Sequence, residues 1–297
     1  MTHVSSYFPA KAQPWRERSG RLSWFKLVVF VALFIPGLYT ALALSQSWLQ
    51  PKPITEALHL TGEWAFRWLL ISLAVTPLRR LTQFNKLLLV RRMLGLGALA
   101  YLVIHFALYI VSLHFDLARV ASEIVLRIYL TIGFVALVGF SALGATSTDG
   151  MIRHLGAERW NRLHQIVYVL IALGLLHYFM QAKLDVYQPT LMLGLFVLLM
   201  GHRLLVRFKL GDNILALIGL AVGSGIATAL LEAGWYKVAS GVPPLRVLAA
   251  NLDVSDTIRP ALWIGVIGLA LPILRAARPL WSKKPPAVRV RPQRSAA

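Results

Sequence analysis

The chain has 297 residues, of which 57% are hydrophobic and 14% are charged, and its formal net charge is +19. Soluble domains carry about 25% charged residues, so this balance indicates a membrane protein. The absence of cysteine excludes disulfides, iron–sulfur clusters, thiolate-ligated haem and cysteine-based zinc sites.

The N-terminal region predicts a retained first span and no cleavable signal peptide. Residues 1–23 are polar and basic, and the apolar run that starts at Trp24 is too long for the core of a signal peptide. We expect residues 1–23 to form a cytoplasmic segment.

Apolar segments of membrane-spanning length follow one another along the chain. A hydrocarbon core of about 30 Å needs about 20 apolar residues in a helix. The sequence therefore predicts an all-α polytopic membrane helix bundle: a six-span domain over 24–208, an extension over 209–282 with two more spans, and a basic, unstructured tail over 283–297. The expected spans are 24–46, 58–78, 93–113, 126–145, 163–181, 189–208, 213–233 and 260–276.

Lysine and arginine positions predict the orientation. If the N-terminus is cytoplasmic, 23 of the 31 basic residues lie on the cytoplasmic side, seven lie outside, and Arg67 falls within a span. This asymmetry follows the positive-inside rule and predicts that both termini of this inner-membrane protein lie in the cytoplasm. The positive charge then faces anionic lipid headgroups, and nucleic-acid binding is not needed to explain it.

Three histidines are the main candidates for cofactor binding. His105 and His177 fall at a similar, outer depth on different spans, so they could ligate one haem iron from both sides. His164 opens the fifth span at its cytoplasmic end, about 20 Å from His177 along an ideal helix. We expect it to bind a second haem or another inner cofactor. Hydrogen bonding to a neighbouring helix is the alternative for each of these residues.

The spacing of His164 and His177 does not by itself prove two stacked haems. Thirteen residues rotate an ideal helix by about 220°, so the two side chains do not share a face. A tilted helix or a local bulge would reconcile the spacing with two haems.

The second span carries His59, Glu63 and Arg67 along one stripe. Arg67 lies near the middle of this span, where an unpaired charge is costly. Its partner is either a haem propionate or Glu63, which stands four residues earlier in the favourable order for an intrahelical pair.

Three stretches of the sequence resemble the haem-binding membrane subunits of bacterial methionine sulfoxide reductases, the MsrQ (YedZ) family. This family belongs to the ferric-reductase-like transmembrane group. The resemblance covers residues 24–208, and its most specific part is the L-G-x-x-x-W-x-x-L-H pattern at 155–164. The stretches are HLTGEWAFRWLLISLAVTPLRR (59–80), RRMLGLGALAYLVIHFALY (91–109) and TSTDGMIRHLGAERWNRLHQIVYVLIALGLLHY (146–178).

The resemblance implies a function and a cofactor. His105, His164 and His177 match the three haem-associated histidines of the family, which implies one or two b-type haems. The implied partners are the quinone pool and a periplasmic molybdenum enzyme, MsrP, which reduces methionine sulfoxide in oxidised envelope proteins. FMN is also associated with the family. In this reading the chain carries electrons, and the catalytic reaction takes place on the partner.

Two departures and two rival readings remain. Typical members end soon after the sixth span, whereas this chain adds about 85 residues. It also lacks the soluble flavin–nicotinamide module of related oxidases, so its electron donor is expected to be external or lipid-soluble. The rivals are a haem-containing terminal ferric or cupric reductase, and a haem-free membrane transporter that uses His59, Glu63, Arg67 and His105 as a proton relay.

Overall fold

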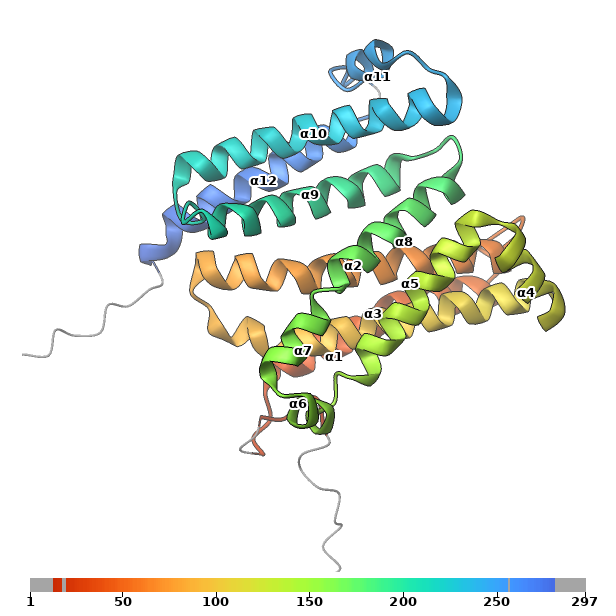
Figure 1. Ribbon diagram of the computed structural model, residues 1–297, viewed down its shortest axis with the longest axis horizontal. Helices are drawn as coiled ribbons and strands as arrows, with labels where there is room; N and C mark the ends of the chain where they lie inside the picture. Colours follow the sequence, from red (N-terminus) through yellow and green to blue (C-terminus); the bar gives the residue numbers. More distant parts are fainter. Residues whose placement is uncertain (1–12, 18–19, 256, 281–297) are drawn as a thin grey trace, which may run out of the picture.

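The computed structural model describes residues 13–17, 20–255 and 257–280, and it is a bundle of long helices joined by short loops (Figure 1). The predicted all-α polytopic architecture is therefore confirmed for this part of the chain. The predicted basic tail over 283–297 and most of the predicted N-terminal segment lie outside the described residues.

Seven helical segments of the described chain are long and apolar enough to cross a membrane. They correspond to seven of the eight predicted spans. One of them, 157–182, combines two shorter helices. The others are formed by α1 (Trp24–Ser45), α3 (Leu88–Ser112, extended by a short 3₁₀ turn before it), α5 (Ile128–Ala145), α9 (Tyr187–Arg207), α10 (Ile214–Ser240) and α12 (Pro260–Ala277).

The remaining predicted span, 58–78, forms helix α2 (Pro53–Thr82), which is less apolar than the other spans. Glu63 and Arg67 lower its hydropathy, and it begins at Pro53 rather than at the predicted residue 58. Proline suits a first helical position because the missing N–H needs no partner there. Helix α2 packs against α3 and α9 in the centre of the bundle, and this central place shields its charged pair.

The predicted fifth span, 163–181, lies within one apolar helical segment, 157–182, which a short turn divides into two helices. Helix α7 (Ala157–His164) ends at His164, and α8 (Val167–Ala182) begins after a two-residue break. His164 is thus the last residue of α7, and His177 lies on α8.

Three short helices lie outside the predicted spans. Helix α4 (Leu117–Leu126) stands between α3 and α5, and Asp116 caps its start by accepting a hydrogen bond from the backbone N–H of Arg119. Helix α6 (Asp149–Leu155) precedes α7, and α11 (Pro244–Ala250) lies between α10 and α12.

The extension packs beside the core as a second group of helices. Helices α10 and α12 lie along each other and against α9, above α2 in Figure 1. Glycines permit this close approach, because a Cβ on Gly268 would lie 2.8 Å from the Cα of Ala221. Both predicted C-terminal segments are thus helices of the same bundle.

A polar junction ties the extension to the core. Asp212, in the loop between α9 and α10, lies 3.0 Å from Arg80 of α2 and 4.0 Å from Arg275 of α12. His202 of α9 is also buried in the bundle, with only 2% of its surface exposed.

Candidate functional site

A cavity of about 700 Å³ lies between α2, α3, α4, α5, α8 and the start of α9. Its lining residues all fall between Thr55 and Pro189, so the core forms it without the extension. Cofactor pockets are typically about 300–1,000 Å³. The cavity therefore has room for a large cofactor.

The two histidines predicted to share a metal face this cavity from different helices. The Nδ1 atom of His105, on α3, lies 2.8 Å from the backbone oxygen of Leu58. The Nδ1 atom of His177, on α8, lies 2.7 Å from the backbone oxygen of Tyr129. A carbonyl can only accept, so each Nδ1 carries the proton and each Nε2 keeps a free lone pair. This is how metal-binding imidazoles are usually oriented.

The spacing of the two rings suits a metal held between them. Their ring centres are 6.5 Å apart, and their planes are at 86° to each other. An imidazole nitrogen binds a metal at about 2 Å, which places the two ring centres about 6 Å apart across a six-coordinate iron. The structure thus brings the rings of His105 and His177 together, at a spacing close to that of two imidazoles on one metal ion.

Glycines make room for both rings. A Cβ added to Gly62 would lie 2.9 Å from the Nδ1 of His105, and one added to Gly133 would lie 2.7 Å from the Nδ1 of His177. A Cβ on Gly174 would lie 2.7 Å from the ring of Phe66 in the wall of the cavity. Side chains at these positions would fill the space that the imidazoles and a flat cofactor need.

Apolar and polar side chains both line the cavity, and Glu63 and Tyr178 are among the polar ones. Phe66, Leu69, Leu102 and Phe140 line its deeper part, toward the middle of their helices. Around its mouth, α4 and the start of α5 place charged and hydroxyl groups. These are Arg119, Glu123, Arg127 and Tyr129.

The two arginines at the mouth differ in their pairing. Arg127 pairs with Glu123, and its Nη1 donates a 3.1 Å hydrogen bond to the Tyr129 hydroxyl. The guanidinium of Arg119 makes no hydrogen bond or ion pair within the described part of the chain. It is therefore available to an anionic group in the cavity. Arg119 did not stand out in the sequence, because helix α4, on which it lies, was not expected.

Arg67 does not line the cavity. Its Nη2 lies 2.8 Å from Glu63 and 3.5 Å from Gln188, and its guanidinium rests over the ring of Trp64. Glu63 also accepts a 2.9 Å hydrogen bond from Tyr178. The sequence left two partners open for Arg67, a haem propionate or Glu63, and in the structure Arg67 pairs with Glu63.

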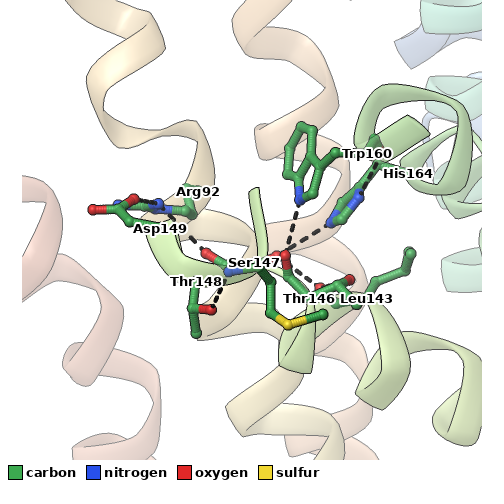
Figure 2. A network of polar contacts seen from close by, with 9 residues as sticks. Arg92, Leu143, Thr146, Ser147, Thr148, Asp149, Trp160 and His164 are labelled. Carbon is green, nitrogen blue, oxygen red and sulfur yellow. Dashed lines mark hydrogen bonds and ion pairs between the residues drawn. The ribbon is translucent and has the colours of Figure 1, made fainter. Parts of the chain in front are cut away.

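His164 lies apart from the cavity, in a polar network at the end of α5 (Figure 2). Its ring stacks on Trp160 at 3.8 Å, and its Nδ1 lies 3.0 Å from the Trp160 backbone oxygen. Its Nε2 lies 3.2 Å from the Ser147 hydroxyl, which also donates to Leu143. The Trp160 indole N–H donates to the backbone oxygen of Thr146 at 2.9 Å. Trp160 and His164 therefore each hold α7 against the segment that follows α5.

Comparisons with known proteins agree with the resemblance. The family model for the ferric reductase like transmembrane component matches residues 61–175. No solved structure matches the chain.

Curated relatives match a larger part of the chain. The protein-methionine-sulfoxide reductase heme-binding subunit MsrQ of Herminiimonas arsenicoxydans is 41% identical over 174 residues, which are 58% of this chain and 80% of the relative. The MsrQ of Rhodospirillum rubrum is 38% identical over 190 residues, which are 64% of this chain and 89% of that protein. Because these relatives match over most of their own length, the chain belongs to the MsrQ family of heme-binding subunits.

Proposed function

We propose that this chain is a b-type haem subunit that transfers electrons across a bacterial inner membrane. The paired imidazoles of His105 and His177 carry this proposal, because two free Nε2 atoms face a common cavity at the spacing of axial ligands. Membership of the MsrQ family supports it. When bound there, haem supplies a one-electron carrier whose potential the protein sets through its ligands and surroundings.

The cavity residues divide the work of holding a haem. His105 and His177 would hold the iron, and apolar residues such as Phe66 and Phe140 would contact the macrocycle. Arg119, and Arg127 in addition to its pair with Glu123, would provide cations for the two propionates. Because Arg67 does not line the cavity, we assign it no propionate.

His164 is proposed to serve a second haem or another cofactor near the opposite end of the bundle. Its Nδ1 contacts a backbone oxygen as those of His105 and His177 do. The Ser147 hydroxyl near its Nε2 has a second acceptor in Leu143, so it can leave the imidazole without losing its own hydrogen bond.

The proposed donor is the quinone pool and the proposed acceptor is MsrP. A quinol releases two electrons and two protons as it becomes a quinone. Reduction of a methionine sulfoxide to the thioether consumes two electrons and two protons and releases water. The chain then conducts two electrons, one at a time, for each sulfoxide repaired.

The proposed orientation places the mouth of the His105–His177 cavity at the periplasmic face and both termini in the cytoplasm. The charge asymmetry of the loops supports it. In this frame the haem edge faces the side on which MsrP acts, and His164 faces the side of the N-terminus.

The experiment uses the purified, reduced protein in stopped flow. We expect rapid reoxidation of haem when MsrP and methionine sulfoxide are both present, and slow reoxidation with either alone. The family match to ferric reductases favours one rival, a terminal metal reductase. Rapid reoxidation by ferric chelate, with no response to MsrP and sulfoxide, would support that rival.

The cofactor content is a separate measurement. Acid extraction and chromatography give the haem and FMN bound per chain. We expect one haem for the His105–His177 site, and a second one if His164 binds haem. A colourless preparation, from cells that supply haem, would contradict the proposal.

A further inference from the structure

A second pocket, separate from the haem cavity, lies in the C-terminal extension. It has a volume of about 210 Å³ and lies where α11 folds back against α10, at the top of Figure 1. Three groups of residues line it: the end of α10, helix α11 and the start of α12. The polar ones are Glu232, Tyr236, Arg246, Asn251 and Arg259.

Glu232 is a buried carboxylate that lacks a countercharge. Only 1% of its surface is exposed, and its carboxylate accepts a 2.8 Å hydrogen bond from the Nδ2 of Asn251. No cation of the described chain lies within ion-pair distance of it. A carboxylate accepts about four hydrogen bonds, and burying a charge without a partner is costly. The site therefore favours a ligand that brings a positive charge.

Asn251 adds a second acceptor. It is 4% exposed, and its Nδ2 donates to both Glu232 and the backbone oxygen of Val247. Its Oδ1 is buried and has no partner among the described residues. Buried amide oxygens are nearly always hydrogen-bonded, so this atom indicates a missing donor. The carboxylate and the amide oxygen together suit a group with several N–H donors.

Two arginines add positively charged hydrogen-bond donors to the same pocket. Arg246 on α11 and Arg259 at the start of α12 line it, and neither guanidinium has a hydrogen bond or ion pair within the described residues. Guanidinium groups match phosphate oxygens in charge and geometry. The pocket thus combines unpaired acceptors with unpaired cationic donors.

We propose that this pocket binds a phosphoethanolamine group, with its primary ammonium on Glu232 and Asn251 and its phosphate on Arg246 and Arg259. An ammonium has three N–H donors, enough for both acceptors. At about 30 Å³ for each water-sized group, 210 Å³ holds roughly seven, close to the size of this headgroup.

The position of the pocket favours a lipid as the source of this group. Glu232 lies about 27 Å along α10 from Ile214, close to the thickness of a hydrocarbon core of about 30 Å. The carboxylate therefore reaches headgroup level when the helix begins at the opposite boundary. Leu245 and Leu252 beside the pocket are 78% and 80% exposed, and such apolar side chains can contact acyl chains.

Native mass spectrometry of the full chain in nanodiscs tests the proposal, with phosphatidylethanolamine, phosphatidylcholine and phosphatidylglycerol as probes. We expect phosphatidylethanolamine to bind at least tenfold more tightly than the other two. Phosphatidylcholine has a quaternary ammonium without N–H donors, and phosphatidylglycerol has no ammonium. Equal retention of all three lipids would overturn the proposal.

Variants separate the two halves of the site. Glu232→Gln and the pair Arg246→Gln with Arg259→Gln should each lower phosphatidylethanolamine binding about tenfold. The matched controls Glu158→Gln and Lys237→Gln lie outside the pocket and should bind it like the parent chain. Because Glu232 is buried, thermal unfolding of its variant is measured in parallel, and the exposed Arg246 provides a variant that leaves the core packing intact. Unchanged binding in a folded Arg246→Gln, Arg259→Gln chain would overturn the proposal.

Free phosphoethanolamine distinguishes the lipid from a soluble ligand. It should compete with the lipid only at concentrations at least a hundredfold above that of the lipid, because it lacks acyl chains. Binding as tight as that of the lipid would overturn the assignment to a membrane lipid. Haem content and reoxidation should be unchanged in all these variants, so the test is independent of the proposed electron transfer.

Discussion

The imidazoles of His105 and His177 lie 6.5 Å apart at 86° to each other, and each is fixed by a hydrogen bond from Nδ1 to a backbone oxygen. The two oxygens belong to Leu58 and Tyr129, on α2 and α5. Four helices therefore set the position of two nitrogens. Such a site keeps its geometry while the charge of a bound iron changes, which suits electron transfer.

The first prediction concerns the glycine behind His177. In Gly133→Ala the new methyl carbon would lie 2.7 Å from the Nδ1 of His177, so the imidazole must move away from Tyr129 and out of line with His105. We expect the reduced α-band per protein to fall by more than half. Absorption spectra of the purified variant measure this loss.

A matched glycine serves as the control. Gly219→Ala places a methyl group on α10 where nothing lies within 4 Å. Alanine favours helix by about 1 kcal/mol over glycine, so neither variant should lose helical stability for intrinsic reasons. A normal spectrum in Gly133→Ala would contradict the assignment of His177.

The second prediction concerns Arg119. A cation near a haem stabilises the reduced, less positive iron, so Arg119→Gln should lower the midpoint potential and speed haem loss. The shift should be larger at low ionic strength, because salt screens exposed charges. Redox titration and haem transfer to an acceptor protein measure the two effects. The control is Arg153→Gln on α6, and identical values in both variants would remove Arg119 from the site.

The third prediction concerns Arg67. Its loss in Arg67→Met leaves the Glu63 carboxylate, which is 21% exposed, with only the Tyr178 hydroxyl. We expect a loss of stability of about 1–3 kcal/mol, with haem content unchanged. The double variant with Glu63→Gln should recover part of the loss, because it removes the unpaired charge. Loss of haem without loss of thermal stability would restore the propionate reading.

Much of the architecture could be predicted because hydrophobic length is a local property of the sequence. Seven spans are predicted by their apolar runs. The remaining span, α2, is also predicted, although Glu63 and Arg67 lower its hydropathy. The break between His164 and Val167 could not be predicted, since the run from α7 to α8 contains no proline or glycine at that point. Packing decides it.

The site was predictable in part for a related reason. The depths of His105 and His177 follow from their positions in their spans, so their meeting could be inferred. Their orientation could not, because it depends on Leu58 and Tyr129, whose backbone oxygens carry no sequence signal. Similarly, Arg119 reaches the cavity only because α4 folds across its mouth.

The fourth prediction concerns orientation. Reporter fusions after Lys183, between α8 and α9, should read periplasmic, and fusions after Arg278, beyond α12, should read cytoplasmic. The basic residues favour this frame. A periplasmic signal after Arg278 would mean that α10 or α12 does not cross the membrane.

The fifth prediction addresses the central claim, that His105 and His177 ligate one iron and His164 does not. The low-spin EPR signal and the reduced α-band are measured for His105→Ala, His177→Ala and His164→Ala, each normalised to protein, with the exposed His154→Ala as control. The account predicts loss of the same low-spin signal in the first two variants and its retention in the last two. Loss of that signal in His164→Ala, with retention in His105→Ala, would contradict it.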